Sequence, residues 1–251
     1  MLTKLDFVAP STYNIPPTSK RDFVPEPIAS EYLAPSFDFA FNMSFGNAGH
    51  HRNHRTGGSA KRKNGEIFVN AFQGKVAEFV FYDWLKKHGI TTSLPDVTLM
   101  GKGLWDDSDF TVNGKKISIK SAAYFSNLML LETQDWNHNG DYIPNMEMGN
   151  ASYNYFVLIR VKPDGKKLMK DSKLYYADKA ERITLKRIFA SEKWSADLVG
   201  FATKDDLQMI IANKHIIPQG GLLNGRIPMD ASNYYFQSND LRGIGGLINL
   251  L

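Results

Sequence analysis

The feature that most constrains this chain is a predicted β-hairpin in residues 108–120, which read Ser-Asp-Phe-Thr-Val-Asn-Gly-Lys-Lys-Ile-Ser-Ile-Lys. The central Asn-Gly pair is a strong hairpin signal, because a type I′ turn needs positive φ angles at both central positions. Apolar residues alternate on both arms, so one face of the hairpin is apolar. The other face carries Asp109, Ser118 and Lys120.

A carboxylate and a lysine held on rigid strands can bind a divalent metal and activate a water for phosphodiester cleavage. The segment before the hairpin adds a further acid. Residues 66–88 have apolar positions at helical spacing and end next to Gly89, a natural residue after a helix C-terminus. Glu78 shares a face of this predicted helix with apolar residues, so we expect it to point toward the sheet.

The hairpin resembles the core motif of the PD-(D/E)XK, or restriction-endonuclease-like, nucleases. In that superfamily an Asp on one strand and a (D/E)-X-K tripeptide on the next form the metal site, and many members carry a Glu on the preceding helix. The resemblance extends from roughly residue 66 to residue 161. It implies an α/β fold with a restriction-endonuclease-like core, in which helices flank a mixed central β-sheet. The prolines and aromatic residues of residues 1–48 separately predict an extended N-terminal segment before this core.

The resemblance also implies a site. Asp109 and Glu78, with the backbone carbonyl of Ile119, would bind Mg²⁺. Lys120 would lie near the attacking water, and Ser118 would orient a metal-bound water or the lysine.

This chain departs from the pattern at Ser118, which stands where the tripeptide begins with an acid. A serine cannot supply the second carboxylate. Glu78 from the helix or Glu132 from a following element could replace it, and we favour Glu78. The first acid is also open, because Asp96 follows a proline and forms a literal Pro-Asp pair; we prefer Asp109, which is already on the strand.

The net charge of +4 is modest, but residues 49–65 carry five basic side chains and no acid. This run predicts phosphate contacts that do not depend on base sequence. A second segment, residues 233–242, mixes aromatic, amide and arginine side chains of the kind that contact base edges. The predicted DNA-binding residues are Arg52, Arg55, Lys61, Arg62, Lys63, Asn233, Tyr235, Gln237 and Arg242.

Composition sets outer limits. The chain has no cysteine, which excludes disulfides and cysteine-bound metals, and no run of about 20 apolar residues that would span a membrane. The first residues lack the apolar stretch of a secretory signal, so we expect a soluble cytoplasmic protein.

Further elements follow from local patterns. We expect strands over residues 37–45, 155–161 and 198–202, and helices over residues 183–189 and 205–212. We divide the chain into an extended N-terminal segment with a basic arm, residues 1–65, and a nuclease domain with C-terminal recognition elements, residues 66–251.

The functional hypothesis is a Mg²⁺-dependent type II restriction endonuclease that cuts double-stranded DNA. The family implies a homodimer and a partner methyltransferase. The alternatives are a structure-specific, repair or defence nuclease of the same fold, and a non-catalytic DNA-binding protein on a decayed nuclease fold, for which Ser118 is the chief argument.

Overall fold

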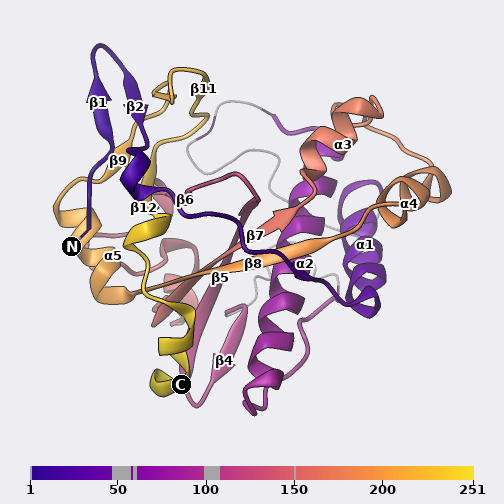
Figure 1. Cartoon of the computed structure of the whole chain (residues 1–251), viewed down its shortest axis with the longest axis horizontal. Helices are drawn as coiled ribbons and strands as arrows, with labels where there is room; N and C mark the ends of the chain where they lie inside the picture. The colour runs from indigo at the N-terminus through magenta and orange to yellow at the C-terminus, as the bar shows by residue number, and fades with distance from the viewer. Residues whose placement is uncertain (1, 47–57, 59–60, 99–107, 150) are drawn as a thin grey trace.

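The computed structural model describes residues 2–46, 58, 61–98, 108–149 and 151–251. At its centre is a five-stranded mixed sheet, so the expected α/β class is confirmed (Figure 1). Strand β5 runs parallel to β7, and the other neighbours are antiparallel. The order across the sheet is β3 (Glu26–Pro27), β8 (Ser195–Thr203), β7 (Tyr155–Lys162), β5 (Lys115–Ala123) and β4 (Phe110–Val112).

The predicted hairpin is present as β4 and β5. Phe110 pairs with Ile117 and Val112 with Lys115. Asn113 has a φ angle of 47° and Gly114 one of 76°, as the type I′ turn requires. The predicted strands over 155–161 and 198–202 are confirmed as β7 and β8. Seven of the eight residues of β7 are buried, because strands flank it on both edges and packed layers cover both faces.

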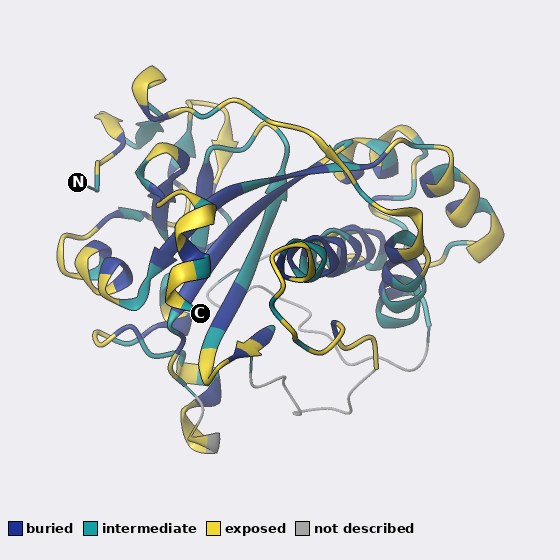
Figure 2. Cartoon of the chain, turned by 60° about the horizontal axis from the view of Figure 1, so that its bottom comes forward, coloured by how far each residue is buried: buried dark blue, intermediate teal, exposed yellow. Residues whose placement is uncertain are grey.

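One face of the sheet is covered by α2 (Asn64–Lys87) and α1 (Ser30–Ser44). The helix predicted over residues 66–88 is therefore confirmed as α2. Its apolar side chains and those of α1 form the larger core with the sheet. Much of α2 and of the central strands is dark blue, which marks buried residues, in Figure 2. The shorter helices α3 (Gly165–Asp171) and α4 (Arg182–Ala190) extend this layer at one end, and α4 confirms the helix expected over residues 183–189.

The strand expected over residues 37–45 is wrong, because this segment lies in α1. Every second residue in the run is apolar, but Phe37, Phe41 and Phe45 are also four residues apart. That spacing places them on one side of a helix, where the rings of Phe37 and Phe41 stack with centroids 6.1 Å apart. Burial against the aromatic side chains of α2 selected the helix.

The opposite face carries a second layer. It consists of α5 (Lys204–Ala212) and a three-stranded sheet in the order β6 (Leu128–Glu132), β12 (Asn233–Gln237) and β9 (Ile216–Ile217). Phe156 and Leu158 of β7 are buried against this layer. The helix predicted over residues 205–212 is confirmed as α5, and Thr203 caps it in a reciprocal capping box with Asp206.

The N-terminal residues are part of the same fold. Strand β3 pairs with β8, and β1 (Asp6–Val8) and β2 (Thr12–Asn14) join β10 (Leu222–Leu223) and β11 (Ile227–Pro228) in a small four-stranded sheet. The fully buried Arg160 binds Asp197 and also donates to the carbonyl oxygens of Arg21 and Asp22. Residues 2–46 are thus tied to β7, β8 and the C-terminal region.

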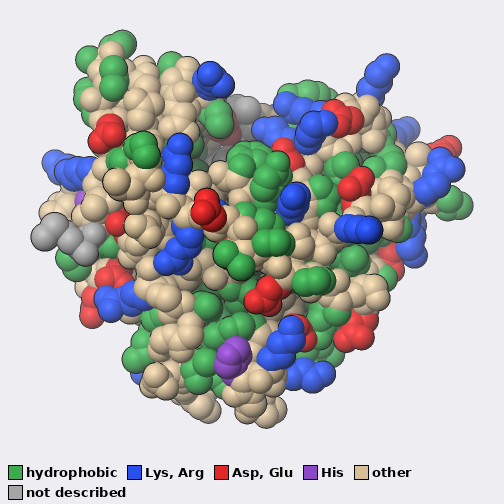
Figure 3. All heavy atoms as spheres, in the orientation of Figure 1, with side chains coloured by type: hydrophobic (Ala, Val, Ile, Leu, Met, Phe, Trp, Pro, Cys, Tyr) green, Lys and Arg blue, Asp and Glu red, His purple; other side chains and the backbone are tan. Residues whose placement is uncertain are grey.

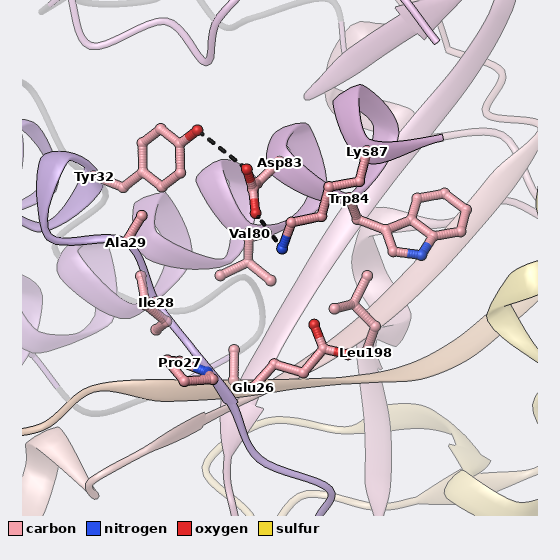
Figure 4. Close-up of a pocket in the computed structure, with 11 residues that line it drawn as sticks. Glu26, Pro27, Ile28, Ala29, Tyr32, Val80, Asp83, Trp84, Lys87 and Leu198 are labelled. Carbon is pink, nitrogen blue, oxygen red and sulfur yellow. Dashed lines mark hydrogen bonds and ion pairs between the residues drawn. The ribbon is translucent and has the colours of Figure 1, made fainter. Parts of the chain in front are cut away.

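The start of α1 is also fixed to the end of α2 (Figure 4). Asp83 accepts a hydrogen bond from the Tyr32 hydroxyl at 3.4 Å and forms an ion pair with Lys87 at 2.8 Å. Burial, together with the nearby Asp83 carboxylate, raises the pKa of Tyr32 to about 12. The remaining elements are 3-10 turns: η1 (Pro17–Ser19), η2 (Thr133–Asp135), η3 (Ile143–Met148), η4 (Ser238–Asp240) and η5 (Ile244–Leu250).

Candidate functional site

The polar face of the hairpin points away from α2. Phe110, Val112 and Ile117 belong to the core beneath α2. Ser118 and Lys120 have the opposite parity on β5 and pair with Phe156 and Leu158, which face the second layer. The structure therefore brings Asp109, Ser118 and Lys120 to one face of the sheet, as the alternation predicted.

Asp109 is held where β4 and β5 separate. The strand ladder between them ends at the pair Phe110–Ile117, so the amide of Ile119 has no strand partner on this edge. One carboxylate oxygen of Asp109, Oδ2, takes that place and accepts from the Ile119 amide at 2.6 Å. The same oxygen accepts from the Ser118 hydroxyl at 3.3 Å. These bonds fix the acid beside the strand that carries Lys120.

Lys120 is half-buried at the edge of an open polar cleft of about 420 Å³. Within the described ranges its ammonium makes no hydrogen bond or ion pair. The cleft lies beside the part of β5 that β4 no longer covers. Its walls come from α2, β5, β6, β7 and β12, and the lining residues are Asn70, Gln73, Ile119, Lys120, Ser121, Ala122, Ser126, Leu128, Met129, Leu130, Glu132, Leu158 and Asn233.

The two candidate replacement acids have different surroundings. Glu132, at the end of β6, lines the cleft with Lys120. Glu78 is not among the lining residues, and its Oε2 binds the Lys75 ammonium at 2.6 Å. Lys75 is 5% exposed and also donates to the carbonyl oxygen of Asp96 at 2.7 Å. Glu78 therefore neutralises a buried lysine. The place of Glu132 in the cleft favours it as the second metal-binding acid, whereas the sequence favoured Glu78.

Asp96 is exposed and its carboxylate serves its own loop. Thr98 donates to it from both the amide and the hydroxyl, at 2.7 and 2.9 Å. These two hydrogen bonds lower the pKa of Asp96 from its ordinary value. Asp109 stays the predicted first acid.

The predicted basic arm is described only in part. Arg52 and Arg55 lie outside the described residues. Lys61 is exposed at the start of α2, and Lys63 pairs with Asp178 at 2.8 Å. Arg62 is half-buried beside them.

The residues predicted for base contacts on the tail are mostly internal. The Tyr235 hydroxyl accepts from the Leu5 amide at 2.9 Å, and the Gln237 amide donates to the Thr3 hydroxyl at 2.7 Å. Both side chains are at most 3% exposed, so they hold the segment before β1 and cannot reach a base edge in this conformation. Arg242 is exposed but pairs with Asp206. Asn233 is buried yet lines the cleft.

Sequence reasoning missed Asn70 and Gln73 of α2, which line the cleft. The Gln73 amide donates to the Ser121 hydroxyl at 3.3 Å, next to Lys120. Their spacing in the sequence could have indicated this, because two amides three residues apart lie on the same side of a helix and interrupt its apolar residues.

A divalent cation is compatible with the donor set here. Among the residues that the structure describes, no group of three His, Asp or Glu side chains converges. Mg²⁺ needs only one or two protein carboxylates, because it keeps several waters and binds substrate phosphate oxygens. Two carboxylates are candidates for this role: Asp109, which lies on the same face of the hairpin as Lys120, and Glu132, which lines the cleft with Lys120.

Comparisons with protein-family models, curated proteins and solved structures found no match for this chain. None of the helices in the described part combines the length and the apolar character needed to cross a membrane.

Proposed function

We propose that the chain is a Mg²⁺-dependent endonuclease that hydrolyses phosphodiester bonds in double-stranded DNA. The observation that carries the proposal is that Asp109 and Lys120 lie on one face of a rigid hairpin, where Lys120 lines a polar cleft. A strand scaffold holds such groups more precisely than a loop would.

The surrounding fold supports a restriction-endonuclease-like core. Helix α2 packs on the apolar face of the β4–β5 hairpin, and β5 lies parallel to the buried strand β7. The order of helix, hairpin and strand along the chain agrees with the resemblance seen in the sequence. Fold likeness alone does not establish an activity, so the argument depends on the site.

Each residue has a stated role in this proposal. Asp109 and Glu132 hold Mg²⁺, which when bound lowers the pKa of a water and offsets negative charge on the phosphate. Lys120 donates hydrogen bonds to the attacking water and to the phosphoryl oxygens as their charge grows. Ser118 donates to the Asp109 carboxylate and keeps it beside the strand.

Sequence-specific cleavage by a homodimer, with a methyltransferase that protects host DNA, is the form of the proposal that the family resemblance favours. The amides of Asn70, Gln73 and Asn233 around the cleft suit contacts to a polar, hydrogen-bonding substrate.

The test is incubation of plasmid DNA with purified protein and Mg²⁺, with EDTA and Lys120→Ala as controls. We expect discrete fragments that disappear in both controls. A smear that disappears in both would indicate a repair or defence nuclease of the same fold. Cleavage that persists in Lys120→Ala would contradict the assignment of the site.

A non-catalytic DNA-binding protein is the second candidate. Ser118 replaces the expected acid, and the Asp109 carboxylate already closes the sheet edge through its bond to Ile119. A gel shift with duplex DNA and no cleavage in Mg²⁺ or Mn²⁺ would favour this alternative.

A further inference from the structure

The positive charge of the chain is concentrated in one region, residues 162–187, which we call the basic lobe. It contains α3, the first two thirds of α4 and the segment between them. Nine lysines and arginines and four acids give it a net charge of +5, which exceeds the +4 of the whole chain. The remaining residues together carry a slight negative charge, so the lobe alone accounts for the basic character of the protein.

The lobe presents these cations to solvent. Figure 3 shows Lys and Arg side chains gathered at the end of the molecule where α3 and α4 lie in Figure 1. Acids in the lobe are partly engaged, since Asp171 pairs with Lys167 and Asp178 pairs with Lys63. In the described part of the chain, seven exposed cations of the lobe form no ion pair: Lys162, Lys166, Lys170, Lys173, Lys179, Lys186 and Arg187.

Two of these lysines are oriented by packing. The ammonium groups of Lys166 and Lys170 lie 5.3 and 5.5 Å from the centre of the Tyr175 ring. A lysine that lies along an aromatic ring loses less freedom when it binds an anion. Tyr176, next in the chain, is 67% exposed.

The lobe adjoins the cleft through two elements. Val69 of α2 contacts Gly165 at the start of α3, and its neighbour Asn70 lines the cleft. Strand β7 leads directly into the lobe, and its last residues pair with the end of β5, which also lines the cleft. The lobe and the cleft therefore share one end of the sheet.

We propose that the basic lobe is a docking surface for the phosphate backbone of DNA, which holds the duplex beside the cleft. This inference rests on the proposed function, because it takes DNA as the polyanion. The sequence predicted phosphate contacts, independent of base sequence, for the basic run at residues 49–65. The proposal assigns such contacts to α3 and α4. The binding is electrostatic, so it weakens steeply with salt.

The test measures binding without cleavage. A fluorescent 30-base-pair duplex is titrated with the full chain in EDTA at several salt concentrations, and anisotropy gives the affinity. The lobe variant carries Lys166→Gln, Lys170→Gln and Lys179→Gln, which keep much of each side chain's length. The control carries Lys86→Gln, Lys115→Gln and Lys214→Gln, which remove the same charge at the end of α2, beside the hairpin turn and just after α5.

We expect the lobe variant to bind about tenfold or more weakly at 100 mM salt. The slope of log affinity against log salt should fall by about 2.7, the value for three lost phosphate contacts. The control should bind within about twofold of wild type. Equal losses in the two triple variants, or no loss in the lobe variant, would overturn the proposal.

Cleavage of plasmid DNA in Mg²⁺ is measured separately, so the two proposals can fail independently. Lobe-dependent binding by a chain that never cleaves would keep the docking surface and reject the nuclease. If the wild-type protein cleaves DNA but the lobe variant binds duplex as well as wild type does, the nuclease is kept and the docking surface is rejected. Co-flotation with vesicles containing one third phosphatidylserine, without binding of duplex, would assign the lobe to a lipid surface and reject DNA.

Discussion

Strands β5 and β12 both carry polar side chains in the interior, and the two strands use them differently. On β12, Asn233, Tyr235 and Gln237 are at most 3% exposed. Tyr235 and Gln237 bond to the segment before β1, and Asn233 donates to the carbonyl oxygen of Ala231 two residues earlier. On β5, Lys120 is half-buried, faces a cleft and has no ion-pair partner within the described residues. Polar groups whose bonds are already made stabilise a fold, whereas a charged group left without a partner beside a cleft is available to a ligand.

The largest expected effect comes from Asp109→Asn. The amide oxygen still accepts from Ile119, so the free energy of unfolding should change by less than about 0.5 kcal/mol. Loss of the negative charge removes the metal-binding role, and cleavage should fall by about a thousandfold.

Asp109→Ala separates the two roles of this side chain. It should lose the same activity and also about 1–2 kcal/mol of stability, because the Ile119 amide then has no acceptor at the strand edge. Chemical denaturation and single-turnover cleavage measure the two effects. Retained cleavage in Asp109→Asn would show that Asp109 serves only the sheet edge.

The two candidate acids give the next contrast. Glu132→Gln should lower cleavage by about a hundredfold. Glu78→Gln should cost about 3 kcal/mol of stability, because the buried Lys75 loses its carboxylate, while the folded fraction keeps its activity. The opposite pattern would return the catalytic role to Glu78.

Gln237→Ala tests the stabilising strand. Its side chain donates to Thr3 at both the hydroxyl and the carbonyl, and removal should cost about 1–2 kcal/mol. Cleavage per folded molecule should stay within about twofold of wild type, since this residue does not line the cleft. A specific change in the bases cut, without loss of stability, would restore Gln237 as a recognition residue.

The smallest expected effect concerns pH. Burial, with Lys4 nearby, lowers the pKa of His215, against a weaker opposite effect of Asp240. The unfolded chain therefore binds a proton at His215 more readily than the folded chain does. The contribution of neutral His215 to the free energy of unfolding is full above about pH 6.5 and is lost as pH falls below that value. Thermal unfolding at pH 7.5 and 5.5 should show a smaller acid loss in His215→Leu than in wild type. An equal loss of stability in both chains would show that His215 is not the cause of the acid loss.

Local signals predicted a large part of this fold. The Asn113-Gly114 turn, the helix over residues 205–212 and the strand over residues 155–161 each depend on neighbours in sequence, and each is confirmed. The run from Phe37 to Phe45 was misread because its apolar spacing fits a strand and a helix alike, and only packing on α2 decides.

The site was predictable where it is local and not where it depends on tertiary contacts. Asp109 and Lys120 share a hairpin, so alternation alone placed them on one face. Glu132 reaches the cleft because β6 pairs with β12, about a hundred residues later, and no local pattern encodes that pairing. Glu78 resembled a catalytic acid because it shares a helix face with apolar residues. Lys75 lies within reach three residues earlier on the same helix, but the burial of that lysine, which commits Glu78 to it, depends on tertiary packing.

The central claim is that Lys120 acts on a phosphodiester and does not support the fold. Single-turnover cleavage of labelled duplex in Mg²⁺ by wild type and Lys120→Ala, with thermal unfolding of both chains, tests it most directly. The account predicts that cleavage falls by at least about a hundredfold while Tm stays unchanged. Equal cleavage rates, or a loss explained by a lower Tm, would contradict it.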